Sequence, residues 1–278
     1  MNLKGSFYIL LFVIIVALTG VFLGNLNQTL NPAVFLFFSA FVTMIIFGVV
    51  SYTQTNFYFI KKANNFKLNI LKLNLASLLV WLGYTYALKY VEPAIVVIIA
   101  NACGPLLIVM LASYMQGSNS LYKIEKIAAI GIALSLVFII YNNLIGESAV
   151  KIFNSKTVLW GVIFAFLTGI GQILYIIFSK NMSDHKFTSS EIIFWRYPLV
   201  LIVSLFLLDK SVFTLFLQGP FYSIQILILS IFGMALPVFV FQKGLKLTDP
   251  FIVSILMLLE PIIMFIGQTF DPRLKISI

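Results

Sequence analysis

Apolar stretches long enough to cross a bilayer recur along almost the whole chain, and they constrain the fold more than any other feature of the sequence. A helix rises about 1.5 Å per residue, so about 20 apolar residues cross a hydrocarbon core of about 30 Å. We count nine such stretches. They run over Phe7 to Leu23, Ala33 to Tyr52, Leu71 to Lys89, Ala94 to Ala112, Ile124 to Tyr141, Thr157 to Ser179, Ser190 to Leu208, Tyr222 to Gln242 and Phe251 to Phe270. The sequence therefore predicts an all-α, polytopic membrane helix bundle.

The composition agrees with a membrane protein, because 61% of the residues are hydrophobic and only 10% are charged. Soluble domains average about 25% charged residues. The net charge of +9 does not indicate nucleic acid, since the lysines lie between apolar stretches rather than in one cluster. The chain has one cysteine and one histidine, too few for a typical metal site. It has no phosphate-binding GxxxxGK[ST] loop, so an ATPase motif is also missing. We expect no enzyme activity, no cofactor and no nucleic-acid partner.

Basic residues between the stretches predict the orientation. With a cytoplasmic N-terminus, eleven lysines lie inside and six basic residues outside, while Arg196 lies within a stretch. The inside set is Lys4, Lys61, Lys62, Lys67, Lys72, Lys123, Lys126, Lys180, Lys186, Lys243 and Lys246, and the outside set is Lys89, Lys151, Lys156, Lys210, Arg273 and Lys275. The positive-inside rule therefore favours a multi-pass protein of the inner (plasma) membrane with its N-terminus in the cytoplasm.

A pattern of leucine, acid-proline and a later proline occurs twice. The first copy contains Leu88, Glu92-Pro93 and Pro105, and the second contains Leu245, Asp249-Pro250 and Pro261. If each half has five spans, an odd number, the two halves enter the membrane from opposite sides. This predicts an inverted repeat, with residues 1–150 as the first half and 151–278 as the second, and a substrate site near mid-membrane where the halves meet.

With these motifs, the sequence resembles the EamA-type carriers of the drug/metabolite transporter superfamily. The family pattern is A-L-x-x-x-x-P and a later proline in the fourth helix, then L-x-x-x-x-P and Glu-Pro in the ninth. The matching residues are Ala87, Leu88, Pro93 and Pro105, then Leu245, Pro250, Glu260 and Pro261, with Arg196, Lys126 and Gly131 also resembling the family. The resemblance implies ten helices in two five-helix repeats and secondary transport.

Two departures separate the chain from that family pattern. An arginine common in the second helix is missing near Phe38 or Ser39, and no apolar stretch follows Phe270, so the tenth helix is absent from the second half. We therefore keep an alternative function, a truncated or regulatory membrane subunit without transport activity of its own. A membrane enzyme is the least favoured interpretation, because Asp184-His185 has no companion groups.

Glu260 is the acid placed deepest in an apolar stretch. A carboxyl group in hydrocarbon favours its neutral form, so Glu260 could bind and release a proton as a carrier changes state. The structural alternative is a protonated acid that hydrogen-bonds to a backbone carbonyl freed by Pro261.

Arg196 lies about two helical turns, roughly 10 Å, into its stretch. Its guanidinium keeps its charge and needs an anion, so a substrate carboxylate or phosphate would be a natural partner. Three other interpretations remain open: snorkelling toward the headgroups, pairing with Glu191, and pairing with Glu260 across the bundle.

Polar and aromatic side chains in three stretches complete the predicted site. Polar groups in hydrocarbon face the bundle interior, where they line a cavity or join helices. The candidates are Asn101, Thr168, Gln172, Tyr84 and Trp81. Pro105 and Pro261 are the predicted hinges, because each removes a backbone donor from its helix.

The function predicted from these features is secondary transport of a small metabolite by alternating access, with Arg196 holding an anionic group and Glu260 coupling proton binding to the cycle. The partners expected are the substrate and the lipid bilayer, and a homodimer is left open.

Overall fold

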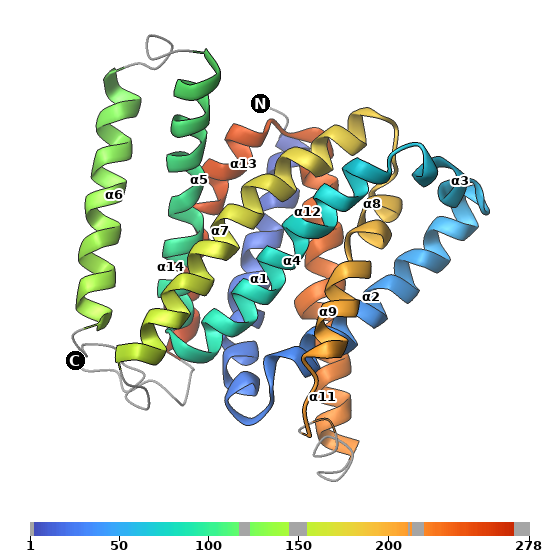
Figure 1. The fold of residues 1–278 in the computed structure, drawn as a ribbon, viewed down its shortest axis with the longest axis horizontal. Helices are drawn as coiled ribbons and strands as arrows, with labels where there is room; N and C mark the ends of the chain where they lie inside the picture. Colours follow the sequence, from blue (N-terminus) through green and yellow to red (C-terminus); the bar gives the residue numbers. More distant parts are fainter. Residues whose placement is uncertain (1–2, 117–122, 145–154, 211, 213–219, 270–278) are drawn as a thin grey trace.

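The structure is a computed structural model that describes residues 3–116, 123–144, 155–210, 212 and 220–269. In this described part of the chain the secondary structure is entirely helical (Figure 1). The predicted boundary at residue 150 and the end of the ninth stretch at Phe270 lie outside the described residues.

The first half of the chain forms long helices joined by short connections. Its elements are α1 (Leu3–Thr29), α2 (Pro32–Thr55), the short α3 (Tyr58–Asn64), α4 (Lys67–Tyr90), α5 (Pro93–Gln116) and α6 (Lys123–Leu144). The second half is more divided. Its elements are α7 (Ser155–Asp184), α8 (Ser189–Arg196), α9 (Pro198–Phe206), α11 (Pro220–Ser230), the π-helical η1 (Ile231–Ala235), α12 (Leu236–Leu247), α13 (Pro250–Met257) and α14 (Glu260–Gln268).

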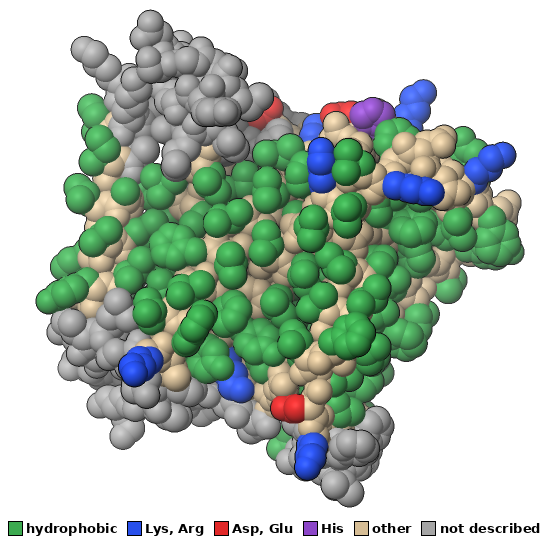
Figure 2. Space-filling model, viewed as in Figure 1, with side chains coloured by type: hydrophobic (Ala, Val, Ile, Leu, Met, Phe, Trp, Pro, Cys, Tyr) green, Lys and Arg blue, Asp and Glu red, His purple; other side chains and the backbone are tan. Residues whose placement is uncertain are grey.

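The apolar stretches predicted from the sequence are all helical. Six helical segments of the described chain are long and apolar enough to cross a membrane, and three further apolar helices are shorter. Together they coincide with the nine predicted stretches. Hydrophobic side chains cover the middle of the molecule, while charged side chains lie toward two opposite edges (Figure 2). The predicted polytopic helix bundle is confirmed.

The last three predicted stretches are not single regular helices, and for two of them the sequence did not indicate a break. The seventh is divided between α8 and α9 at Tyr197, just before Pro198, and the eighth contains the π-helical turn before Pro237. The ninth is interrupted at Leu258 and Leu259, just before Glu260-Pro261. Proline lacks the amide hydrogen that closes a helical turn, so each break lies where that donor is missing. By contrast, α5 continues without interruption through Pro105.

The two halves pack through α4 against α7 and through α1 against α12. At the first crossing, a Cβ on Gly83 would lie 2.7 Å from the carbonyl oxygen of Phe164, and a Cβ on Gly171 would lie 2.8 Å from that of Ala76. Only glycine permits backbones to approach this closely. In the predicted repeat, α4 corresponds to α12 and α7 corresponds to α1, so the repeat would relate one of these helix pairs to the other. The repeat itself stays a prediction.

Candidate functional site

A cavity of about 70 Å³ lies between helices of both halves. It is bordered by α1, α2, α4 and α5 from the first half and by α7, α8, α11, η1, α12 and α14 from the second. The seven residues predicted to bind substrate or couple transport all line this one cavity. They are Glu260, Arg196, Asn101, Trp81, Tyr84, Gln172 and Thr168.

Arg196 is the last residue of α8, and its side chain is only 2% exposed. Its Nε donates a hydrogen bond to Ser77 Oγ over 3.3 Å. The guanidinium carbon lies 3.8 Å from the centre of the Tyr175 ring and 5.1 Å from that of Tyr197. The Nη1 atom is buried and has no hydrogen-bond partner among the described residues. A buried cation therefore lines the cavity with one donor group unused.

The alternative partners considered for Arg196 are engaged elsewhere. Glu191 forms an ion pair with Lys62 over 3.5 Å and caps α8 by accepting a hydrogen bond from the Thr188 amide over 2.8 Å. Glu260 lines the same cavity as Arg196, but no carboxylate of the described chain lies within ion-pair distance of the guanidinium. Burial to 2% exposure also differs from a snorkelling arginine, whose charged end would reach the headgroups.

Glu260 begins α14 directly after the break, and its side chain is 5% exposed. Asn101 on α5 donates from Nδ2 to Glu260 Oε2 over 3.1 Å and to the carbonyl oxygen of Met257 over 2.8 Å. Met257 lies four residues before Pro261, so its carbonyl is the one that this proline leaves without a helical donor. The freed carbonyl therefore accepts a hydrogen bond from Asn101.

Asn74 on α4 fills the break between α8 and α9, beside Arg196. Its Nδ2 donates to the carbonyl oxygen of Trp195, and its Oδ1 accepts from the amide of Leu199 over 2.9 Å. In a regular helix these two backbone groups would bond to each other. The side chain is inserted between them, which satisfies both ends of the opened turn.

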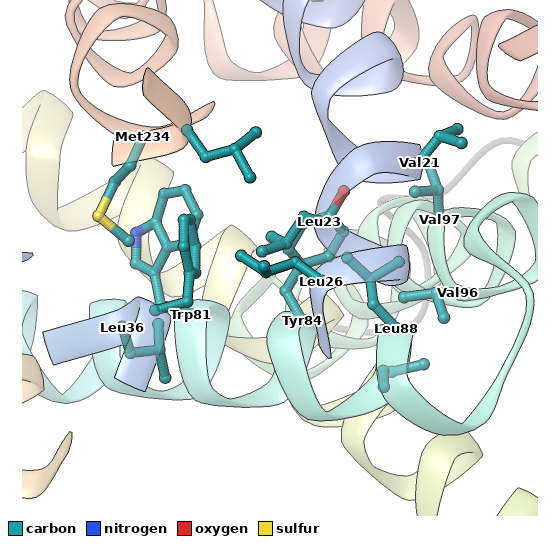
Figure 3. Packing of buried hydrophobic residues seen from close by; sticks show 14 of the residues in the cluster. Val21, Leu23, Leu26, Leu36, Trp81, Tyr84, Leu88, Val96, Val97 and Met234 are labelled. Atoms are coloured by element: carbon teal, nitrogen blue, oxygen red, sulfur yellow. The ribbon is translucent and has the colours of Figure 1, made fainter. Parts of the chain in front are cut away.

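Trp81 and Tyr84 project from the same face of α4, Trp81 beside Met234 and Tyr84 beside Leu23 and Leu26 (Figure 3). The indole Nε1 of Trp81 and the hydroxyl of Tyr84 are buried and have no hydrogen-bond partner in the described chain.

Thr168 and Gln172 belong to α7. The Thr168 hydroxyl donates to the carbonyl oxygen of Phe164 over 2.9 Å, and Gln172 Nε2 lies 3.4 Å from the Met257 sulfur. Besides lining the cavity, Thr168 is thus bonded to its own helix, and Gln172 is in contact with α13. Pro261 is half-buried and directly follows the break, whereas the Pro105 side chain lies outside the described part of the structure.

Several lining residues were not predicted, and four of them are aromatic. Tyr175 contacts Arg196, and its hydroxyl donates to Gln242 Oε1 over 3.0 Å. The other aromatic lining residues not predicted are Phe12, Phe35 and Phe241. Tyr175 could have been found, because the spacing of Thr168, Gln172 and Tyr175 places them on one face of a helix. The described residues contain no cluster of histidine, cysteine or acidic side chains able to hold a metal ion.

A comparison with protein-family models identifies the second half of the chain. Residues 159–270 match the EamA-like transporter family. The predicted resemblance to EamA-type carriers is thus confirmed on a segment that contains Arg196, Glu260 and all three helix breaks. The EamA-like match and the apolar helices support a multi-pass membrane protein, and the match suggests a membrane transporter. Comparisons with curated proteins and with solved structures gave no match.

Proposed function

We propose that this protein is a secondary transporter that moves a small metabolite with an anionic group across the inner (plasma) membrane by alternating access. The observation that carries the proposal is Arg196, a buried cation that lines the cavity without a carboxylate partner in the described chain. A buried charge is costly unless it is paired, so a substrate anion would provide the negatively charged partner that Arg196 lacks in the described chain.

The carboxylate or phosphate of the substrate would bind the Nη1 side of Arg196. Tyr175 and Tyr197 fix the plane of the guanidinium, and Ser77 holds its Nε, so the unused donor has a defined direction. A guanidinium held in this way is suited to planar, charge-assisted hydrogen bonding.

The rest of the substrate would contact aromatic rings. Trp81, Tyr84 and Phe241 line the cavity beside the polar groups, and the unused donors of Trp81 and Tyr84 could bind substrate oxygens. Such a lining favours a compact metabolite with a flat or apolar body over a sugar-like one.

Glu260 is proposed as the proton-coupling group. It is buried, lines the cavity and is hydrogen-bonded to Asn101, and proton binding there would change the charge of the cavity by one unit. The titratable neighbours in the lining are Tyr84, Tyr175 and Arg196. Intramembrane acids in such positions commonly serve proton relays.

Access would require helix movement, because about 70 Å³ is smaller than the several hundred Å³ of an ordinary ligand site. The breaks before Pro198, Pro237 and Pro261 provide positions where helix halves can move separately. Pro261 remains a proposed hinge, and so does Pro105 despite the unbroken helix around it.

The test has a binding step and a flux step. The purified protein is screened by thermal unfolding against amino acids, organic acids and nucleotide-linked metabolites, since a bound ligand raises apparent stability by about 2.7 kcal/mol at 100 times its Kd. Proteoliposomes then measure uptake or efflux of the metabolites that bind. We expect stabilisation only by anionic compounds and flux of at least one of them. Binding without flux would favour the regulatory-subunit alternative.

A further inference from the structure

A second, positively charged pocket of about 530 Å³ lies where α2, α3 and the α7–α8 connection meet. Its charged lining comprises Lys61, Lys62, Lys186 and Glu191. The charge of Glu191 is matched by Lys62, 3.5 Å away, and no carboxylate of the described chain lies within ion-pair distance of Lys61 or Lys186. The pocket therefore carries an excess of two positive charges, with His185 counted as neutral.

Lys186 adopts an unusual backbone conformation, with a φ of 62°. Its amide bonds to the Ser183 carbonyl over 3.0 Å, and the Phe187 amide bonds to the Met182 carbonyl over 3.1 Å. This is the hydrogen-bond pattern that ends a helix at a left-handed residue, a position normally taken by glycine. Lysine there is locally unfavourable, because a residue with a Cβ is strained in the left-handed conformation.

An apolar groove of about 380 Å³ lies along the α2–α3 turn, and its lining residues alternate in the sequence with those of the charged pocket. Tyr52, Phe57 and Phe59 line it together with Gly48 and Val49. Tyr58, a lining residue of the charged pocket, lies between Phe57 and Phe59 in the sequence. Basic and apolar surfaces thus meet at one corner of the bundle, where Figure 1 shows α3 beyond the end of α2.

The corner also has the features of a membrane interface. Phe57 and Tyr58 are 67% and 64% exposed, whereas Phe59 is buried against the Phe194 ring at 5.4 Å. Phe59 thus fixes α3 on α8, while the two aromatic residues before it are exposed. Exposed aromatic residues beside lysines are typical of helices that lie at the headgroup level.

We propose that this corner binds one anionic phospholipid, with the headgroup phosphate between Lys61 and Lys186 and an acyl chain in the groove beside Tyr52 and Phe57. Clustered lysines attract anionic headgroups, and the apolar groove distinguishes a lipid from a free anion. The site is separate from the central cavity and does not depend on transport.

The experiment is thermal unfolding of the full chain in a zwitterionic detergent, titrated with dioleoyl phosphatidylglycerol. Dioleoyl phosphatidylcholine is the neutral lipid with the same acyl chains, and inorganic phosphate is the anion without chains. We expect saturable stabilisation by phosphatidylglycerol, little by phosphatidylcholine and none by phosphate. Equal shifts for the two lipids, or an equal shift with phosphate alone, would overturn the proposal.

Variants separate the lipid site from general surface charge. Lys61→Gln and Lys186→Gly should each raise the apparent Kd for phosphatidylglycerol about fivefold. Lys186→Gly should also raise the lipid-free unfolding midpoint by about 2 °C, because glycine adopts the left-handed conformation without strain. Lys72→Gln removes an exposed lysine that does not line the pocket and should leave the Kd unchanged. An equal loss in Lys72→Gln would refute a specific site.

Discussion

The side chain of Asn101 donates a hydrogen bond over 3.1 Å to the carboxylate of Glu260, across the contact between α5 and α14. The same nitrogen lies 2.8 Å from the carbonyl oxygen of Met257, which Pro261 leaves without its helical donor. One amide from the first half of the chain therefore holds both the buried acid and the helix break in the second half. Movement of α14 relative to α5 would have to break or exchange these bonds.

Removing this amide should destabilise the protein measurably. Asn101→Ala leaves the Met257 carbonyl and the Glu260 carboxylate without their shared donor, so we expect a loss of about 1 kcal/mol in the free energy of unfolding. Thermal unfolding in detergent measures the loss. Asn181→Ala, at an exposed asparagine whose side chain bonds to Asn69, should change stability by less than about 0.5 kcal/mol. Equal effects of the two substitutions would contradict the role given to Asn101.

The break beside Arg196 gives a related prediction. Asn74→Ala should lower the free energy of unfolding by about 2 kcal/mol. It leaves both the Trp195 carbonyl and the Leu199 amide of the opened turn without their hydrogen-bond partner. Asn27 provides the matched control, since it is fully buried but, within the described part of the chain, its side chain makes a single hydrogen bond, to the Thr85 carbonyl over 2.9 Å. We expect unfolding midpoints in the order wild type, Asn27→Ala, Asn74→Ala, from highest to lowest. A midpoint for Asn74→Ala at or above that of Asn27→Ala would show that the opened turn does not need the Asn74 side chain.

The helices could be predicted from the sequence because bilayer-length apolar stretches admit few structures other than helices. Of their three interruptions, the sequence indicated only the one before Pro261. A proline shows only that one amide donor is missing, and contacts with neighbouring helices decide whether the helix opens there or continues. The helix α5 continues through Pro105, whereas the turns before Pro198 and Pro261 open around side chains of Asn74 and Asn101.

The cavity lining was predictable where polar residues stand out from an apolar background. Asn101, Thr168 and Gln172 had to face protein rather than lipid, and all three line the cavity. Tyr175 did not stand out, because aromatic residues are frequent throughout this chain. Asn74 lies two residues from Lys72, near a predicted membrane edge, so nothing in the sequence distinguished it from an interfacial residue.

Close packing of α4 on α7 can be tested at Gly171. A Cβ there would lie 2.7 Å from Leu79 Cβ and 2.8 Å from the Ala76 carbonyl oxygen, so Gly171→Ala should destabilise the protein by about 1–3 kcal/mol. Gly131 on α6 is the control, because an added Cβ meets nothing within 4 Å in the described structure. Gly131→Ala should stabilise by up to about 1 kcal/mol through helix propensity alone. Thermal unfolding midpoints that move in the same direction would refute the close contact.

Proton coupling through Glu260 predicts a specific change in the pH response. Glu260→Gln keeps the size of the side chain and an oxygen acceptor for Asn101 but cannot exchange a proton. Flux in proteoliposomes should then become insensitive to an imposed pH gradient, while substrate affinity changes little. Glu191→Gln is the control, because Glu191 pairs with Lys62 away from the cavity. Flux that still responds to the gradient in Glu260→Gln would exclude Glu260 as the coupling group.

We expect Arg196 to lower the stability of the substrate-free protein while it enables binding of an anionic substrate. Its guanidinium is 2% exposed and has no carboxylate partner in the described chain, so the substrate-free protein bears the cost of an unpaired buried charge. Tyr175, 3.8 Å from the guanidinium carbon, offsets only part of that cost, since a cation–π contact contributes about 2 kcal/mol. Arg196→Met keeps the apolar stem and should therefore raise the substrate-free unfolding midpoint by about 2–4 °C, while stabilisation by anionic metabolites disappears. Arg196→Lys keeps the charge and should retain weakened binding. If Arg196→Met instead lowers the midpoint and leaves ligand stabilisation intact, the charge serves the fold and not a substrate.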